Sequence, residues 1–253
     1  MSAPPVFKDY FSGCATSYAR YRPSYPVVLY DYLRALAPDG DLAWDAGAGN
    51  GQVAVELARS FDRVVATDAS RQQCENAVQG PNIEYRVELA EQSSLAPASV
   101  SLVTVAQALH WFDCPLFFEE VRHVLKPGGV LAVWSYVLFQ SEPEVDLVVR
   151  NLYDDVLGGC WPPERRMVED GYRDLPFPFV EETPPDFSME ALWGFNELMG
   201  YLSTWSAVHR YRELHGVDPL AGAKDRLSAV WGSPHGYKTI KWPIRLRVGR
   251  LIA

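Results

Sequence analysis

The chain has 253 residues, a formal net charge of −9 at pH 7 and an isoelectric point near 5.1. This acidic balance argues against a nucleic-acid-binding protein, which would carry a basic face. No stretch approaches the ~18 uninterrupted apolar residues of a membrane span, and the N-terminus lacks the pattern of a signal peptide. The widely spread cysteines have neither metal nor redox spacing, so we expect a reduced, cytoplasmic protein without a metal site. They are Cys14, Cys74, Cys114 and Cys160.

The N-terminal part of the chain is rich in aromatic residues up to residue 25, and a helix is predicted after it. Pro26 is well placed in the first turn of that helix, which we expect to end near Ala37. Leu29, Leu33 and Leu36 give it an apolar stripe.

The next hundred residues alternate between strand and helix patterns, which predicts a parallel, doubly wound α/β sheet with right-handed crossovers. Ligands of such sheets bind beyond the carboxyl ends of the strands. Residues 93–97 are predicted to form a loop. Lys126–Gly129 is expected to interrupt regular structure before the fifth strand. The predicted strands cover 42–46, 63–67, 83–88, 100–106 and 130–136, and the predicted helices cover 51–60, 70–79 and 115–125.

From Gln140 to about His235 the pattern is mainly helical and is broken by proline clusters. We interpret this part as a helical lid over the strand ends, with a short returning strand near 177–181. The final strand is expected at 238–249, where Pro243 requires either a bulge or a later strand start. The predicted lid helices cover 143–157, 189–200, 203–213 and 218–231.

The run from Asp45 to Gly51 is the most informative motif in the chain. It follows an apolar strand and precedes an apolar-periodic helix, and Gly47, Gly49 and Gly51 allow the backbone to turn sharply and approach a ligand. The spacing is G-x-G-x-G rather than the G-x-G-x-x-G that binds a dinucleotide pyrophosphate. Asp45 would repel a pyrophosphate and attract an ammonium group. The motif therefore favours S-adenosylmethionine (SAM), which carries an α-ammonium, a sulfonium and a ribose diol, over NAD.

A second carboxylate, Asp68, ends the next predicted strand, one strand–helix–strand step along the chain. A carboxylate there can bind the ribose diol of an adenosine cofactor, in NAD enzymes as well as in SAM enzymes. The alternative is that Asp68 caps the helix that opens at Ser70.

Several further motifs give the chain its resemblance to a known family. They are Tyr18–Pro26 (YARYRPSYP), Asp45–Gly51 (DAGAGNG), Thr67–Ser70 (TDAS), Ala90–Glu91, Ala106–Asp113 (AQALHWFD) and Leu125–Gly129 (LKPGG). With them, nearly the whole chain resembles the class I SAM-dependent methyltransferases, in the methyltransferase type 11 branch with trans-aconitate methyltransferase-like members. The resemblance implies a Rossmann-like, seven-stranded sheet completed by two late strands, the last of them antiparallel.

The resemblance also implies a division of the chain and a set of cofactor-binding residues. Residues 1–40 would cover the cofactor, 41–139 would form the SAM-binding core, 140–235 the lid with its returning strand, and 236–253 the last strand. Ala90 and Glu91 would lie beside the adenine ring, and the alternative for Glu91 is a solvated loop acid. The expected cofactor-binding residues are Tyr18, Arg22, Asp45, Gly47, Gly49, Gly51, Asp68, Ala69, Ser70, Ala90, Glu91, Gln107 and Ala108.

His110 and Trp111 are the candidate catalytic residues, because they leave the fourth strand at the centre of the sheet. Methyl transfer from a sulfonium depends mainly on holding the acceptor near and in line, so a dedicated base is not always needed. His110 could act as a base, but we favour a histidine that is packed beside the cofactor and takes no proton. Trp111 is expected to form a wall of the site. Arg22 could clamp the methionine carboxylate or form a surface salt bridge.

The lid carries an aromatic stripe that includes Tyr201 and Trp205 at helical spacing. Such a stripe is more often core than pocket. If it lines a pocket, the acceptor is flat or apolar, and Arg210 would favour a carboxylate on it. The other lid residues of interest are Trp193, His209 and Tyr211.

The sequence thus predicts a SAM-dependent methyltransferase that acts on a small-molecule acceptor, with O-methylation of a carboxylate or hydroxyl favoured. Two alternatives stay open at this point: a SAM-binding regulatory module without turnover, and an NAD-linked oxidoreductase. Neither a nucleic acid nor a membrane is expected as a partner.

Overall fold

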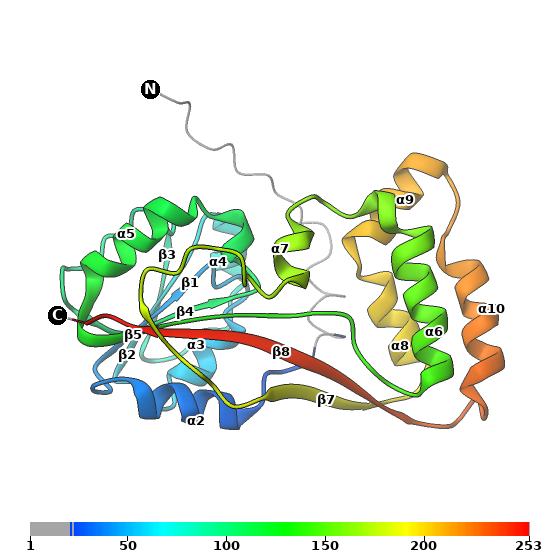
Figure 1. The fold of residues 1–253 in the computed structure, drawn as a ribbon, viewed down its shortest axis with the longest axis horizontal. Helices are drawn as coiled ribbons and strands as arrows, with labels where there is room; N and C mark the ends of the chain where they lie inside the picture. Colours follow the sequence, from blue (N-terminus) through cyan, green and yellow to red (C-terminus); the bar gives the residue numbers. More distant parts are fainter. Residues whose placement is uncertain (1–20, 22, 253) are drawn as a thin grey trace.

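A computed structural model describes residues 21 and 23–252 of the chain. Its sheet has eight strands in the order β3-β2-β1-β4-β5-β8-β6, and β7 pairs with β8 beside this path. The first five strands are parallel to one another, and β8 runs antiparallel to β5, β6 and β7 (Figure 1). The strands are β1 (Leu42–Ala46), β2 (Arg63–Asp68), β3 (Ile83–Val87), β4 (Val100–Ala106), β5 (Leu125–Tyr136), β6 (Val180–Glu182), β7 (Phe187–Trp193) and β8 (Lys238–Arg250).

Helices cover both faces of the parallel strands, which explains why β1, β4 and β5 are nearly continuous runs of buried residues. Helices α2 (Val27–Leu36) and α3 (Gln52–Leu57) pack on one face. Helix α5 (Cys114–Val124) packs on the other face, together with Val168 of α7 (Arg165–Glu169). Helix α4 (Arg71–Asn76) contacts β2 and β3.

Four further helices gather beyond one end of the sheet (Figure 1). They are α6 (Pro143–Asn151), α8 (Phe195–Ser203), α9 (Ser206–His215) and α10 (Leu220–Trp231), and we call them the helical group. The carboxyl end of β5 leads into α6, so the helical group lies at the end of the sheet where the parallel strands finish. Among the described residues, no helix combines the length and the apolar character that crossing a membrane requires.

The parallel core matches the prediction closely, and the β3–β4 connection is free of helix, as expected. The expected interruption at Lys126–Gly129 was wrong, because β5 begins at Leu125 and runs through this segment, and its pairing with β4 starts at Leu125.

One prediction in the late part of the chain was wrong. Residues 189–200 were expected to be helical, yet residues 187–193 form β7 and the helix begins only at Phe195. The composition of this stretch suits a helix, but pairing with β8 buries Met189 opposite Trp242, so tertiary packing decides the structure.

Pro243 needs neither the bulge nor the late strand start that we expected. Strand β8 runs through it without a register shift, and Pro243 pairs with Ser188 of β7. The pairing of β8 with β5 ends one residue later, at Ile244. Pro243 therefore lies where β8 has no partner residue on β5, and its missing N–H breaks no bond of that ladder.

An aromatic cluster around Trp242 joins β7 and β8 to the helical group. Trp242 is fully buried, and its ring centroid lies 4.8 Å from that of Trp193, 5.8 Å from that of Phe139 and 5.5 Å from that of Tyr201. Its indole N–H donates to the Tyr201 hydroxyl at 3.1 Å.

We predict that Trp242→Ala lowers the free energy of unfolding by about 3–5 kcal/mol, because it leaves a large cavity and an unpaired hydroxyl. Leu192→Ala on the paired strand is the control, since Leu192 is 68% exposed and should cost less than about 0.5 kcal/mol. Urea unfolding measures both variants. Equal stabilities would contradict this view of the cluster.

Candidate functional site

The glycine turn lies between β1 and α3, and its three glycines have different surroundings. All three have a left-handed backbone, with φ of 69° at Gly47, 55° at Gly49 and 82° at Gly51. A Cβ added at Gly47 would lie 2.6 Å from the Cβ of Ala108, and one added at Gly51 would lie 2.0 Å from the Tyr85 hydroxyl. A Cβ added at Gly49 would meet no atom of the described residues within 4 Å. Gly47 and Gly51 are therefore required by packing within the protein, and Gly49 is the glycine with open space beside it.

Asp45 is the second-last residue of β1, and it is only 1% exposed. Its Oδ1 accepts a hydrogen bond from the Thr104 hydroxyl at 2.9 Å, and its Oδ2 has no hydrogen-bond partner among the described residues. Burial raises the pKa of the Asp45 carboxyl to about 7, against the hydrogen bond from Thr104 and the nearby backbone N–H of Ala54, which both lower it. A buried carboxylate oxygen without a donor is costly, and a cationic N–H donor from a ligand would satisfy it.

Asp68, at the end of β2, connects the glycine turn to α4. Its two carboxylate oxygens accept hydrogen bonds from the backbone N–H of Gly49 at 2.9 Å and of Ser70 at 2.8 Å. The helix N-cap is Ser70, whose hydroxyl accepts from the Gln73 N–H, so the interpretation of Asp68 as the cap was wrong. The Asp68 carboxylate instead lies against the one glycine that has open space beside it.

The connection from β3 to β4 carries Ala90 and Glu91. Ala90 is buried, and the Glu91 carboxylate accepts the backbone N–H of Asp113 at 2.7 Å, just before α5. Glu91 thus links this connection to the start of α5 rather than standing alone in solvent.

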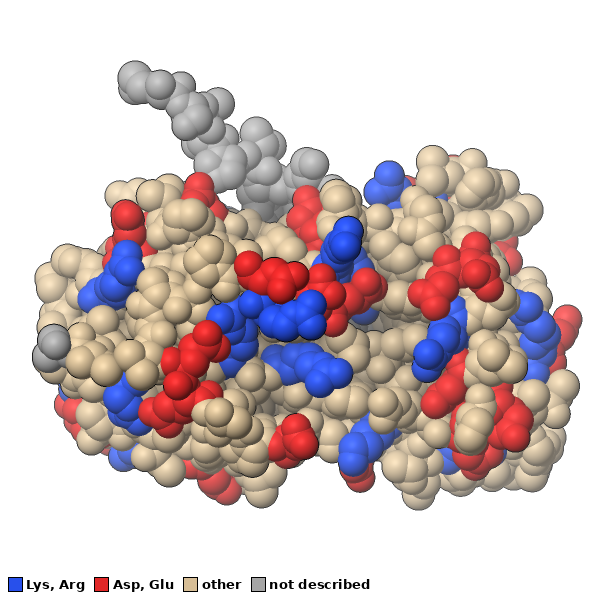
Figure 2. All heavy atoms as spheres, viewed as in Figure 1, with Lys and Arg blue, Asp and Glu red and all other residues tan. Residues whose placement is uncertain are grey.

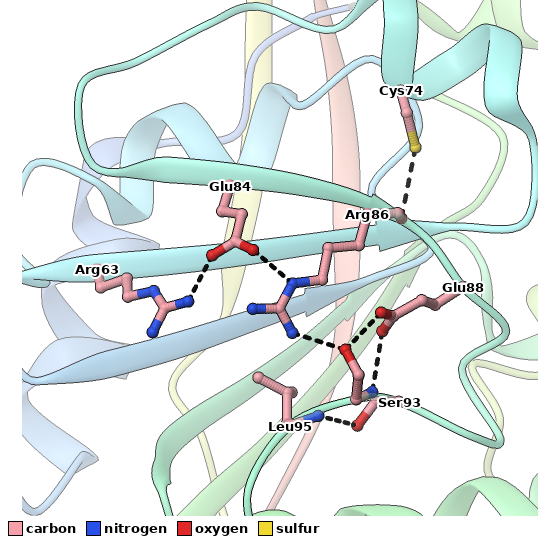
Figure 3. Close-up of polar contacts among 8 residues, drawn as sticks. Arg63, Cys74, Glu84, Arg86, Glu88, Ser93 and Leu95 are labelled. Atoms are coloured by element: carbon pink, nitrogen blue, oxygen red, sulfur yellow. Dashed lines mark hydrogen bonds and ion pairs between the residues drawn. The ribbon is translucent and has the colours of Figure 1, made fainter.

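A polar network on β3 holds the same connection in place (Figure 3). Arg86 donates to the Ser94 hydroxyl at 2.9 Å, and the Ser94 N–H donates to Glu88 at 3.0 Å. Hydrogen bonds from Arg86 and Arg63 lower the pKa of Glu84 to about 2, so Glu84 keeps its charge and its pairing with Arg86 over the physiological range. No motif in the sequence indicated this network.

The chain leaves β4 through Gln107 and Ala108. Gln107 has a left-handed backbone, with φ of 56°. Its N–H donates to Trp134 O at 2.9 Å, and its side-chain amide donates to Tyr136 O at 2.9 Å. Gln107 therefore ties the end of β4 to β5, while Ala108 packs on Gly47.

His110 follows in the short helical turn η1 (Leu109–Trp111) and contacts a residue that we did not predict. Its Nδ1 lies 3.1 Å from the hydroxyl of Tyr172, and the two rings are stacked with an interplanar angle of 20°. Burial, and then the positive charge of Arg165, lowers the pKa of His110 to about 4, so the imidazole is uncharged at neutral pH. Trp111 is 37% exposed beside it. Tyr172 lies in a proline-rich connection that shows no motif, so nothing in the sequence marked it.

The aromatic stripe of the helical group is core, which was the alternative that we favoured. Tyr201 and Trp205 are buried, and their rings pack against each other and against Tyr153 or Trp242. Trp193 belongs to β7, and Arg210 is exposed on α9.

Tyr18 and Arg22 lie outside the described residues. Within the part that is described, no three His, Cys, Asp or Glu side chains gather in a way that could hold a metal ion.

Comparisons with known proteins agree on one family. A family model for a methyltransferase domain matches residues 44–133. A methyltransferase of Dictyostelium discoideum is 35% identical over 237 residues, which cover 92% of this chain and 90% of the relative. The solved structure of a type II methyltransferase from Anaeromyxobacter dehalogenans is 44% identical, with a TM-score of 0.88 over 92% of this chain and 99% of that chain. The methyltransferase pgmE of Aspergillus terreus is 27% identical over 81% of this chain and 63% of its own.

The different surroundings of the glycines predict different costs of an added methyl group. Gly49→Ala should cost about 1–2 kcal/mol of stability, because only the left-handed backbone is strained. Gly51→Ala should cost about 1–3 kcal/mol more, because the new Cβ also collides with Tyr85. Thermal unfolding of the two variants checks this order, and the opposite order would contradict it.

The raised pKa of Asp45 predicts a pH-dependent gain from Asp45→Asn. The unfolded chain releases this proton near pH 3.8 and the folded chain near pH 7. The folded state therefore becomes less stable relative to the unfolded state as the pH rises between these values. The variant without ligand should therefore be more stable than the wild type by about 2–4 kcal/mol at pH 8, with the difference disappearing below pH 4. Denaturant unfolding across this pH range measures the effect. If Asp45→Asn is less stable than the wild type at pH 8, the buried charge of Asp45 does not destabilise the unliganded fold.

Proposed function

The chain belongs to the class I SAM-dependent methyltransferases, and we propose that it methylates a small-molecule acceptor, with carboxylate and hydroxyl oxygens as the first candidates. Membership in this family makes the protein an enzyme and removes the alternative of an NAD-linked oxidoreductase. The observation that carries the proposal is the position of the site at the strand ends, on the side of the sheet where the helical group lies. On the face drawn in Figure 2, basic side chains are interleaved with acidic ones, which suits a small ligand better than a nucleic-acid backbone.

The cofactor would be held by the ends of the first strands. When bound, SAM supplies a methyl group on a sulfonium leaving group. Oδ2 of Asp45, for which the described residues supply no hydrogen-bond partner, is suited to accept from the α-ammonium group, and the space at Gly49 would admit a ligand close to the backbone. Asp68 is suited to the ribose diol, by exchanging its hydrogen bond from Gly49 for ligand hydroxyls.

The remaining expected contacts keep their proposed roles. Ala69, Ser70, Ala90 and Glu91 would surround the adenine side, and Gln107 and Ala108 would shape the floor near the methyl group. Tyr18 and Arg22 would close over the methionine end, with residues 1–40 as a cover.

His110 would lie beside the transferred methyl group as an uncharged, orienting side chain. With a pKa near 4, it is a weak base at neutral pH, and it adds no positive charge next to a sulfonium. Catalysis would then rest on proximity and alignment, which can supply ~7–11 kcal/mol of barrier reduction. Trp111 would form the outer wall, and residues 140–235 would act as the lid.

Isothermal titration with SAM tests the cofactor site. Asp45→Ala and Asp68→Ala should each weaken binding by about 10–100-fold, because each removes a hydrogen bond to or from a charged group. Asp62→Ala is the matched control, since Asp62 is an exposed aspartate directly before β2, at the opposite end of that strand. Unchanged affinity in the first two variants would refute this assignment.

The same titration tests the contact between Asp45 and the ammonium group, through the number of protons released on binding. Because the pKa of Asp45 is about 7, roughly half of the carboxyl is protonated at pH 7, and pairing with an ammonium group should release up to about half a proton. Titrations in buffers of different ionisation enthalpy measure this release, which should vanish in Asp45→Asn. Proton release of the same size in both proteins would assign it to another group.

A product assay tests the acceptor class. Release of S-adenosylhomocysteine is measured with panels of small carboxylic acids, phenols and alcohols, and in parallel with RNA and with a protein extract. We expect release that depends on a small molecule. Release that depends only on RNA or protein would overturn the proposal while leaving the cofactor site intact.

A further inference from the structure

We propose that Tyr172 is a positioning residue for His110: its hydroxyl donates to Nδ1 and thereby fixes the imidazole as the tautomer that carries its proton on Nε2. The inference rests on the proposed function only in placing His110 beside the reacting groups. This tautomer sets the role of His110. Its Nδ1 accepts from Tyr172 and its Nε2 carries the proton, so the ring offers a ligand a hydrogen-bond donor and no basic lone pair.

The direction of the hydrogen bond follows from the burial of Tyr172. This residue is 1% exposed, and its hydroxyl lies 3.1 Å from Nδ1 of His110. A phenol has one proton to donate, and among the described residues Nδ1 is the acceptor found for it. If Nδ1 carried the ring proton, the phenolic proton would be buried without an acceptor, which is unfavourable. The arrangement that satisfies both groups is O–H to Nδ1, with the ring proton on Nε2.

The protonation of both groups at neutral pH agrees with this arrangement. Burial raises the pKa of Tyr172, so the phenol keeps its proton. Burial and the charge of Arg165 lower the pKa of His110 to about 4, so the ring carries one proton. A neutral pair can form only one of the two hydrogen-bond directions at a time.

Tyr172 is held against His110 by backbone geometry that tyrosine rarely adopts. Its φ is 59°, in the left-handed region that is strained for a bulky residue. Such strain persists only where the surroundings enforce it, and it gathers at functional sites. The Tyr172 N–H donates to the carbonyl oxygen of Met167 in α7 at 2.9 Å.

Arg247 of β8 supplies the main restraint on the connection that carries Tyr172. Its guanidinium donates to Tyr172 O at 2.5 Å and to Leu175 O at 3.0 Å, and it pairs with both carboxylate oxygens of Glu181 at 3.0 and 2.7 Å. It also lies 4.5 Å from the centroid of the Phe177 ring. These contacts connect β8 to Tyr172, and the Tyr172 hydroxyl in turn contacts His110 in η1, after β4.

Nitrogen NMR on protein labelled with 15N-histidine tests the tautomer without any acceptor or cofactor. The chain has five histidines, and the signals lost in His110→Gln identify the ring of interest. At pH 7 we expect wild-type His110 to be neutral, with its pyridine-type nitrogen at Nδ1 and its proton at Nε2. A ring protonated on Nδ1, or a doubly protonated ring, would overturn the proposal. The wild-type spectrum alone decides this point, even if a variant does not fold.

Tyr172→Phe shows whether the hydroxyl is the cause. The spectrum of His110 should then show a mixture of tautomers, while thermal unfolding shows a folded protein. An unchanged, single tautomer in folded Tyr172→Phe would assign the preference to another group. Arg247→Lys is the second variant, because a lysine cannot hold two carbonyls and a carboxylate in one plane. It should loosen Tyr172 and move the spectrum in the same direction.

Kinetics with an acceptor from the product assay separate positioning from stability. Tyr172→Phe should lower kcat by about 3–30-fold, the worth of one hydrogen bond, and leave the KM for SAM unchanged. In a His110→Gln background the same change should have no further effect, since its only route to the reaction is through the imidazole. Equal losses in both backgrounds would show that Tyr172 acts by another route. A failure to find an acceptor would count against the proposed function and leave the tautomer result standing.

Discussion

The buried carboxylate of Asp45 is the constraint on which the rest of the site depends. The fold places this side chain near the end of a central strand and excludes it from water, and among the described residues only one of its two oxygens has a hydrogen-bond partner. An isolated protein gains nothing from such an arrangement, because an unpaired buried charge destabilises the fold. A cationic ligand that donates to the second oxygen would remove this destabilisation. Binding of an ammonium group is then favoured over binding of a neutral or anionic group.

The strand order explains why this constraint lies beside the other site residues. The order reverses between β1 and β4, and the ends of neighbouring parallel strands open at such a switch point. Asp45 and the glycine turn lie on one side of it and His110 on the other, with Asp68 one strand further out. The close approach of these segments also requires Gly47, where Ala108 occupies the place of a side chain. The glycine motif is thus partly a packing motif, and Gly49 is the one of its three glycines beside which the described residues leave space for a ligand.

The parallel core and the glycine turn could be predicted from the sequence because their signals are local. Buried strands, glycines and a following helix are adjacent in the chain, and the acid at the end of β2 recurs one unit later. Strand β7 could not be predicted, because its partner Trp242 is remote in the sequence and its own residues favour a helix. Tyr172 could not be predicted either, because it reaches His110 through an unusual backbone conformation and a restraint from Arg247. Contacts of that kind depend on the finished fold.

A crystal structure with S-adenosylhomocysteine bound tests the central claim most directly. The account predicts the α-amino nitrogen within hydrogen-bond distance of Asp45 Oδ2, the ribose hydroxyls on Asp68, and ligand atoms in contact with the backbone at Gly49. A ligand bound away from the ends of β1 and β2, or a bound state in which the Asp45 oxygen still has no donor, would contradict it.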